Sequence, residues 1–199
     1  MPFCCDTRHM VPTAYQKEWE YLQGSTDLWH LWASDDLSLD AQLRQQTPEG
    51  MVLVECLGHR LCQRNYRTIT CRAFPFFPYI TRQGDFIGLA AYWEFEDSCW
   101  VISNLQVVTS EYRAQFISTF EYLFDQAPQE QENYQYFSSL MRRVFGRRHR
   151  AICLLHRNGQ YYKVTPRNGR MRLIKPSQLP SFGPYRLAAE LPFPDEINR

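Results

Sequence analysis

The amino-acid sequence predicts an α+β protein with a mostly antiparallel central sheet and flanking helices. In four segments, 14–23, 37–46, 110–125 and 133–145, apolar residues recur at the helical spacing of three or four positions. Short β-branched or aromatic runs, bounded by turn residues, occupy the middle of the chain and return near its end. Helices that flank short, turn-connected strands are typical of the α+β class.

Helix 14–23 turns Tyr15, Trp19 and Leu22 to one face. Two other helices carry local start signals, and helix 37–46 offers Asp35, Asp36 or Ser38 as its N-cap. Helix 110–125 begins at Ser110, which we expect to be the N-cap. The predicted inward side of helix 133–145 is apolar, with Tyr134, Phe137, Leu140, Met141 and Val144.

The predicted strands are short. They are Met51–Cys56, Arg67–Cys71, Phe76–Thr81, Phe86–Phe95, Cys99–Val108, Ala151–His156, Tyr161–Thr165 and Met171–Ile174. Two hairpin turns are expected, at Arg82–Asp85, where Gly84 supplies a positive φ, and at Arg157–Gly159, where Asn-Gly is a strong turn signal.

Composition limits the class of protein. Hydrophobic residues make up 44% of the 199 residues, which is typical of a packed protein, and no run of 18 apolar residues could cross a membrane. The N-terminus lacks the charged and apolar regions of a secretory signal. Seven cysteines, an odd number at irregular spacing, therefore predict reduced thiols and a cytoplasmic location.

Charge is segregated along the chain, although the formal net charge is only +1. Eighteen of the 21 acidic residues lie in residues 1–132, and none lies in 133–189. That acid-free segment carries twelve Lys or Arg: Arg142, Arg143, Arg147, Arg148, Arg150, Arg157, Lys163, Arg167, Arg170, Arg172, Lys175 and Arg186. Such segregation predicts either a polyanionic partner or an internal electrostatic clasp between the two parts.

The polar segment 126–132, interrupted by Pro128, resembles a linker and coincides with the change in charge. We therefore expect an α+β core over residues 1–126 and a basic helix–hairpin module over 133–187. That module is either separate or packed into the same domain. Residues 188–199 are expected to form a tail.

The basic module favours single-stranded nucleic acid, DNA or RNA, as the partner, since it combines cations for phosphates with rings for bases. We predict that phosphates are met by Arg142, Arg143, Arg147, Arg148, Arg150, Lys163 and Arg167. Tyr161 and Tyr162 would offer stacking surfaces, although only one of two successive strand residues can face the ligand. The alternative partner is an acidic protein surface, or the chain's own acidic part.

Catalysis and metal binding have less support. The sequence contains no G-x-S-x-G, P-loop, H-E-x-x-H or G-x-G-x-x-G motif, and we expect no cofactor. A second alternative is a cysteine-dependent enzyme that uses Cys4 or Cys5 with a histidine such as His9. The spacing of Cys56, His59, Cys62 and Cys71 permits a zinc site, but a continuing strand would point His59 away from the thiols, so structural cysteines are expected.

Residues 32–104 resemble the middle of the SRAP family, the SOS response-associated peptidase-like proteins that shield abasic sites in single-stranded DNA. The similarity rests on four stretches: Trp32–Asp36, Gly50–Gly58, Pro75-Phe76-Phe77 through Gly84 to Ala90-Ala91-Tyr92-Trp93, and Ser98–Ser103. The third is similar to the family's P-Y/F-F-I-Y…D-G…F-A-G-L-W hairpin. The resemblance implies an α+β fold and an affinity for DNA.

The family's catalytic residues have no counterparts in this chain. Pro2 occupies the position of the family's cysteine, with Cys4 and Cys5 displaced, and its asparagine and glutamate fall on Trp32 and Leu61. The family's His-x-Arg-Met-Pro motif is missing. The resemblance therefore implies a remodelled relative without the covalent chemistry, in which DNA affinity is retained.

Overall fold

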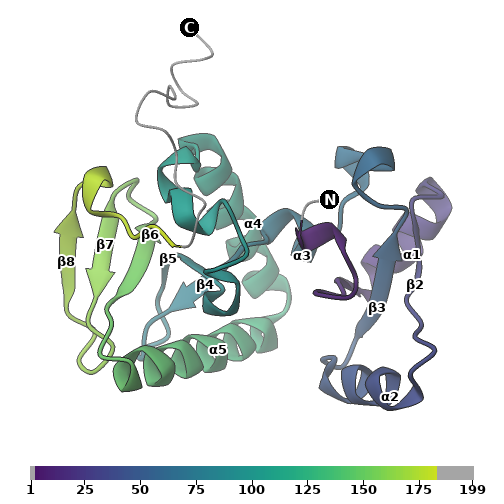
Figure 1. Ribbon diagram of the computed structural model, residues 1–199, viewed down its shortest axis with the longest axis horizontal. Coiled ribbons are helices and arrows are strands. Elements are labelled where there is room, and N and C mark those ends of the chain that lie inside the picture. The colour runs from purple at the N-terminus through teal and green to yellow at the C-terminus, as the bar shows by residue number, and fades with distance from the viewer. Residues whose placement is uncertain (1–2, 183–199) are drawn as a thin grey trace, which may run out of the picture. The chain divides into compact units, whose positions relative to one another are not determined.

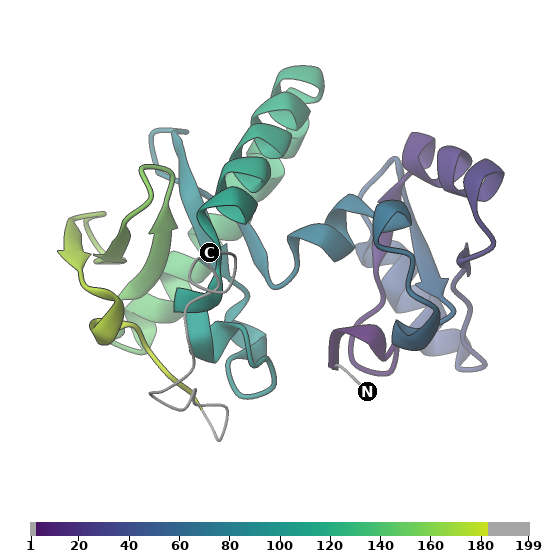
Figure 2. The ribbon, with the colours of Figure 1, turned by 90° about the horizontal axis from the view of Figure 1, so that it is seen from above.

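A computed structural model describes residues 3–182, which form two compact units divided between Phe74 and Pro75 (Figures 1 and 2). Each unit contains an antiparallel sheet, of three strands in the N-terminal unit and five in the C-terminal unit, together with helices. The predicted α+β class with mostly antiparallel pairing is therefore confirmed.

The N-terminal unit is built around β3 (Met51–Cys56), which pairs with β1 (Thr13–Tyr15) and β2 (Trp29–Leu31) on its two sides. Its helices are α1 (Gln16–Ser25), α2 (Leu37–Gln46) and α3 (Ile69–Ala73), with single 3₁₀ turns η1 (Phe3–Cys5), η2 (His59–Leu61) and η3 (Arg64–Tyr66). The core of this unit consists of Ala14, Trp19, Leu22, Leu28, Trp29 and Val54. The predicted helical face of Trp19 and Leu22 is therefore its apolar centre.

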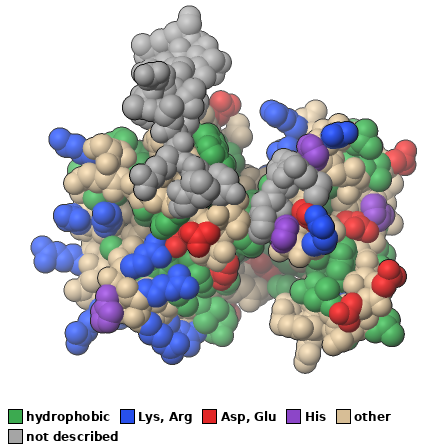
Figure 3. Space-filling model, in the orientation of Figure 1, with side chains coloured by type: hydrophobic (Ala, Val, Ile, Leu, Met, Phe, Trp, Pro, Cys, Tyr) green, Lys and Arg blue, Asp and Glu red, His purple; other side chains and the backbone are tan. Residues whose placement is uncertain are grey.

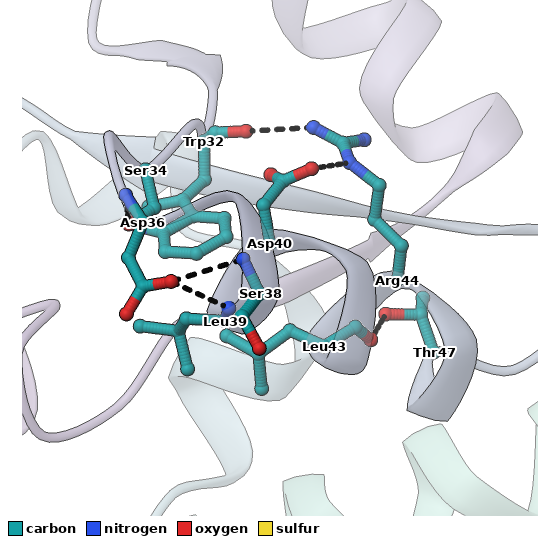
Figure 4. Close-up of polar contacts among 9 residues, drawn as sticks. All are labelled: Trp32, Ser34, Asp36, Ser38, Leu39, Asp40, Leu43, Arg44 and Thr47. Atoms are coloured by element: carbon teal, nitrogen blue, oxygen red, sulfur yellow. Dashed lines mark hydrogen bonds and ion pairs between the residues drawn. The ribbon is translucent and has the colours of Figure 1, made fainter.

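Helix α2 is held at its two ends by side chains (Figure 4). The Asp36 carboxylate accepts the backbone N–H groups of Ser38 and Leu39, at 2.9 and 3.1 Å, which identifies Asp36 as the N-cap. Arg44 pairs with Asp40 at 2.7 Å, one turn earlier on the same face. The carboxylates at the start of this segment therefore stabilise a helix, as the sequence predicts.

The C-terminal unit contains a sheet with the order β4-β5-β6-β7-β8. These strands are β4 (Phe76–Ile80), β5 (Phe86–Ala91), β6 (Ile152–His156), β7 (Tyr161–Val164) and β8 (Met171–Ile174). The connection from β5 to β6 contains 3₁₀ segments η4 (Trp93–Phe95) and η5 (Ile102–Val107), then α4 (Ser110–Gln126) and α5 (Pro128–Arg147); η6 (Pro176–Gln178) follows β8. Strands from before and after the change in charge thus share one sheet.

The two long helices serve opposite faces of that sheet. Phe77 points to α5, where its ring meets Phe137 at 4.7 Å between centroids. Phe76, the preceding strand residue, points the other way and meets Tyr112 of α4 at 6.1 Å. The α5 side is closed by a cluster of Phe77, Tyr79, Ala90, Met141, Phe145, Ile152, Leu154 and Val164.

Two predicted strands are helical. Residues Arg67–Cys71 lie largely in α3, because the Thr68 hydroxyl accepts the backbone N–H of Cys71 at 3.1 Å and caps a helical turn. The apolar run Cys99–Val108 leads into η5, whose residues 102–105 are buried. A short apolar run is compatible with either a buried strand or a buried helix, so its composition alone misleads.

Several boundaries also differ, and α1 begins and ends two residues later than predicted. The strand predicted over Phe86–Phe95 ends at Ala91, and Thr109, not Ser110, caps α4. The predicted linker 126–132 is mostly the first turns of α5, where Pro128 occupies the first helical position. Proline is tolerated there because its missing N–H would have no helical acceptor.

The two units therefore divide the chain at Phe74/Pro75, whereas the charge pattern placed the boundary at 126–133. The basic helix and hairpin pack into the same unit as β4 and β5, which was one of the two arrangements expected. Residues 183–199, which include Arg186 and the predicted tail 188–199, lie outside the described residues.

The pairing of β5 with β6 depends on Gly88, which lies opposite His156. Its φ is 156°, and a Cβ at this position would overlap the Leu155 carbonyl oxygen and lie 2.9 Å from the His156 Cα. Gly84 also has a positive φ, of 94°, but has nothing within 4 Å of a Cβ. Alanine at Gly88 would therefore meet both steric overlap and backbone strain, whereas alanine at Gly84 would meet backbone strain alone.

We expect Gly88→Ala to destabilise the C-terminal unit by about 2–4 kcal/mol, from overlap and strain together. Gly84→Ala, the control, should reduce the free energy of unfolding by about 1 kcal/mol, from strain alone. Urea denaturation of both variants measures the difference. Equal losses would contradict the close approach of β5 and β6.

Candidate nucleic-acid interface

An open groove of about 630 Å³ lies at the C-terminal end of α5. Three segments contribute its cationic side chains: Arg82 from the β4–β5 turn, Arg142, Arg143 and Arg147 from α5, and Arg167 from the β7–β8 turn. His149, just after α5, also lines it. Lys and Arg side chains gather over the C-terminal end of α5 and the outer strands, at the lower left of Figure 3. No carboxylate is among the described residues that line the groove.

The end of α5 has the hydrogen bonds of a Schellman motif. The N–H of Arg150 donates to the Phe145 carbonyl at 3.0 Å, and that of His149 donates to the Gly146 carbonyl at 3.3 Å. The motif requires a left-handed residue, and His149 fills it with φ 52° instead of the usual glycine. The motif thereby fixes the backbone of His149 where its ring borders the groove.

The helix end also favours the cations. Unpaired carbonyl groups give the C-terminus of an α-helix a partial negative charge, so arginines in the last turn are stabilised there. The β4–β5 turn lies beside α5, where the Gln135 side chain donates to the Arg82 carbonyl at 3.3 Å. The same turn is joined to the β7–β8 turn, because the Arg82 Nη2 donates to the Pro166 carbonyl at 3.2 Å. The groove is therefore built on hydrogen-bonded turns and a helix, which hold its cations in one place.

An exposed aromatic ring lies next to the groove. The Tyr136 side chain on α5 is 63% exposed, and the Arg143 guanidinium carbon lies 6.0 Å from its ring centroid. Tyr136 and Arg143 are seven residues apart, two helical turns along one face. This ring is a stacking surface that the sequence prediction did not include among the site residues.

Arg142 borders the groove but is held from within the unit, unlike the solvent-facing phosphate contact that the sequence predicts. Its side chain is only 7% exposed, and its Nη1 donates to the Ile80 carbonyl at 2.8 Å. Its guanidinium also lies 5.6 Å from the Tyr79 ring centroid. Helical geometry explains the difference, because Arg142 follows Ser138 by one turn and that serine hydroxyl accepts the Ile80 N–H. Arg142 therefore attaches α5 to the edge strand.

Arg150 is also engaged within the unit. It forms a two-point ion pair with Glu96, at 2.8 and 2.9 Å, and its guanidinium packs 5.1 Å from the Phe145 ring. Arg157 pairs with Glu121 of α4. These two arginines act as the internal clasp that the charge pattern offered as an alternative, whereas the groove arginines face outward.

The remaining predicted residues lie apart from the groove. Tyr162 packs on the α5 side of the sheet, while Tyr161 lies beneath Arg113 of α4, 5.0 Å away, on the other side. Lys163 shares the face of Tyr161 and lines a second pocket with Glu96 and Arg150. Neither tyrosine is therefore a free stacking surface. Arg148 is exposed at the C-cap of α5 but does not line the groove.

Of the predicted site residues, the structure brings Arg142, Arg143, Arg147 and Arg167 to one groove, and it adds Arg82 and His149, with Tyr136 beside it. Arg82 belongs to the acidic part of the sequence, so a search for basic runs could not find it. The predicted hairpin turn at Arg82–Asp85 does indicate that this arginine lies at an end of the sheet. The sequence does not show that β5 pairs with β6, and this pairing brings the turn beside α5.

The cysteines are free thiols, and several in the N-terminal unit lie near Arg67, whose Nε donates to the Cys62 sulfur at 3.1 Å. Burial raises the pKa of the Cys5 thiol to about 11, with a further rise from Cys4. Burial also raises the pKa of Cys71 to about 12. Protonated thiols are poor nucleophiles at neutral pH, which disfavours Cys5 as a catalytic residue. Within residues 3–182, no three His, Cys, Asp or Glu side chains are arranged to hold a metal ion.

Comparison of the chain with protein-family models, with curated proteins and with solved structures finds no match. The SRAP resemblance therefore remains a prediction. Across residues 3–182, the helices are too short or too polar to cross a membrane.

The opposite roles of two adjacent arginines provide a test. Arg142→Ala should lower the free energy of unfolding by about 2–3 kcal/mol, because a buried carbonyl loses its donor and the side-chain stem loses its packing. Arg143→Ala makes the same change in helix propensity at an exposed position and should alter stability by less than about 0.5 kcal/mol. Thermal and urea denaturation of the pair would contradict this assignment if both variants lost stability equally.

Proposed function

We propose that the protein binds single-stranded nucleic acid, without catalysis, through the groove at the end of α5. The observation that carries the proposal is the convergence of Arg82, Arg143, Arg147 and Arg167, from three separate segments, on one open surface. Arginine is always charged and binds phosphate oxygens in a two-point geometry. The seven free thiols favour the cytoplasm, a reducing compartment, as the location.

The groove fits a flexible polyanion better than a folded partner. Its arginines come from both sides of an open groove, as expected for contacts to a backbone that passes between them. The exposed Tyr136 ring adds the base-stacking surface that single strands use and that duplexes hide. An acidic protein surface is the alternative partner, and it would need the arginines but not the ring.

The SRAP resemblance makes single-stranded DNA the first ligand to test. Its strand pattern lies partly in β4 and β5, and the turn between these strands supplies Arg82 to the groove. The resemblance and the groove therefore point to the same class of ligand by separate arguments. RNA is the comparison ligand, because nothing in the groove selects the sugar.

Salt dependence tests the contacts with phosphate. If the four arginines each meet one phosphate, log K for a single-stranded oligonucleotide should fall with log salt at a slope of about −3. In the variant Arg143→Gln, Arg147→Gln, Arg167→Gln, the slope should shrink to about −1, with equal losses for different nucleotide sequences. Fluorescence anisotropy at several salt concentrations measures both quantities.

The matched control removes the same charge from the N-terminal unit, through Lys17→Gln, Arg60→Gln and Arg64→Gln. These residues are exposed, and none takes part in an ion pair among residues 3–182. The control should keep the slope and most of the affinity. Equal losses in both variants would show a general charge effect, and no binding by the wild-type protein would refute the proposal.

Substitution of Tyr136 distinguishes single-stranded nucleic acid from an acidic protein surface as the partner. Tyr136→Ala should weaken binding of a single-stranded oligonucleotide by about 1–3 kcal/mol, the usual contribution of one stacked base, without changing the salt slope. Tyr122 is an exposed tyrosine on α4 outside the groove, and Tyr122→Ala is the control. Unchanged affinity in Tyr136→Ala, together with a steep slope, would favour an acidic surface as the partner.

A further inference from the structure

Another pocket, of about 290 Å³ and separate from both the groove and the pocket lined by Lys163, lies at the N-terminal end of α4 in the C-terminal unit. Its wall includes Thr109 and Ser110 at the helix start, Arg113 one turn later, and Arg157 and Tyr161 from the β6–β7 hairpin. The groove at the C-terminal end of α5 shares no lining residue with this pocket.

Arg113 is a buried cation with no carboxylate partner among the described residues. Its side chain is only 5% exposed, and no acidic group pairs with it among residues 3–182. The Nη1 has only two long hydrogen bonds, at 3.4 Å, to the carbonyls of His156 and Gln160. The Nε is buried and has no hydrogen-bond partner in the described part of the chain. Buried charges in proteins are normally paired, so this arginine is unusual.

The helix start adds further positive potential. The Thr109 hydroxyl caps α4 by accepting the Tyr112 backbone N–H at 3.1 Å. The first helical hydrogen bond runs from the backbone N–H of Arg113 to the Thr109 carbonyl. The N–H groups of Ser110 and Glu111 therefore have no acceptor within the helix. In a helix of 17 residues, the aligned peptide dipoles add a partial positive charge at this end.

The surroundings of the pocket are cationic as well. Arg157 lies in its wall, although Glu121 balances part of its charge. Burial lowers the pKa of His156, whose carbonyl accepts from Arg113; the hydrogen bond with Asn158 opposes this shift, and the charges of Arg157 and Arg113 add to it. The Tyr161 ring holds the Arg113 guanidinium at 5.0 Å and leaves it beside the pocket.

We propose that this pocket is a binding site for a phosphate group, held by the Arg113 guanidinium, the Ser110 backbone N–H and hydroxyl, and Arg157. A phosphate would give the buried arginine the counter-charge that the described residues do not supply. Helix N-termini bind phosphate because N–H groups and the dipole favour the same anion. Arginine adds paired donors to its oxygens.

The size of the pocket specifies the ligand class. Ligand pockets commonly measure about 300–1,000 Å³, so this one is at the small end of the range. It suits a small phosphorylated molecule or inorganic phosphate, not a polymer. The site is therefore distinct from the proposed nucleic-acid interface in both location and ligand.

Inorganic phosphate is the direct probe. We expect the melting temperature of the full chain to rise by about 3–6 °C when phosphate exceeds its Kd tenfold, relative to potassium chloride of equal ionic strength. Acetate at the same ionic strength is the carboxylate arm and should have little effect. No rise with phosphate would overturn the site, and an equal rise with acetate would overturn its assignment to phosphate.

Two substitutions locate the effect at this pocket. Ser110→Pro removes the N–H and the hydroxyl together, at the first helical position where proline is well tolerated, and should reduce phosphate affinity at least tenfold. Ser110→Ala keeps the N–H and should reduce it less. Arg113→Met should abolish the phosphate response, and Arg157→Gln should weaken it. If Ser110→Pro folds and responds to phosphate like the wild-type protein, the proposed site is wrong.

Arg157→Gln also separates this proposal from the groove. The substitution lies outside the groove and should leave the oligonucleotide affinity and its salt slope unchanged. Conversely, the triple groove variant should keep the full phosphate-dependent rise in melting temperature. Parallel loss of both responses in either variant would show that the two sites are not independent and would overturn the assignment of phosphate to the α4 pocket.

Discussion

The pairing of β5 with β6 is the contact on which the C-terminal unit depends. It joins a hairpin from the acidic part of the chain to strands from the basic part, across a connection that contains both long helices. Gly88 permits this pairing because its backbone approaches Leu155 and His156 more closely than a side chain would allow. The groove follows from it, since Arg82 lies beside Pro166 and Arg167 only when the two hairpins belong to one sheet.

The charge segregation in the sequence resolves into two different uses of arginine. On α5, Arg142 turns inward to a strand carbonyl, and its neighbour Arg143 turns outward to the groove. Beyond the helix, Arg150 and Arg157 pair with Glu96 and Glu121 from the acidic part. Part of the segment therefore forms ion pairs within the unit, and the polyanion hypothesis concerns only the arginines that remain at the groove. A run of like charges in the sequence gives only the amount of charge. The position of each residue around the helix axis determines which side chains reach solvent.

The elements that could be predicted from the sequence are those with a clear hydrophobic periodicity or a strong turn signal. The prediction was wrong for buried segments, whose uniformly apolar residues show no periodicity. The Asn-Gly hairpin, the β4–β5 turn and the amphipathic helices are specified locally, so pattern and structure agree. The apolar run Cys99–Val108 has no period to distinguish strand from buried helix, and Thr68 capped a helix where β-branched residues indicated a strand. Arg67–Cys71 shows that one hydroxyl at a cap can outweigh the intrinsic preference of a short segment.

The candidate site was predictable only in part for a related reason. Arg143, Arg147 and Arg167 could be found from charge density, but Arg82 enters the groove through strand pairing at long sequence separation. The α4 pocket was not predictable at all from the sequence, because Arg113 is a single basic residue in a segment with an acidic neighbourhood. Its significance appears only when the structure shows that the guanidinium is buried and that no carboxylate within residues 3–182 pairs with it.

The two proposed sites should respond differently to salt because their charges differ in exposure. Groove arginines lie in water, where ions screen each contact over ~8 Å at physiological strength, so their binding energy depends on many weak contacts acting together. Arg113 is buried, and screening by bulk ions acts on it far less. A polymer ligand can supply many phosphates, whereas a small pocket holds one. The same residue type thus favours a salt-sensitive polyanion on one surface and a single, less salt-sensitive phosphate at the other.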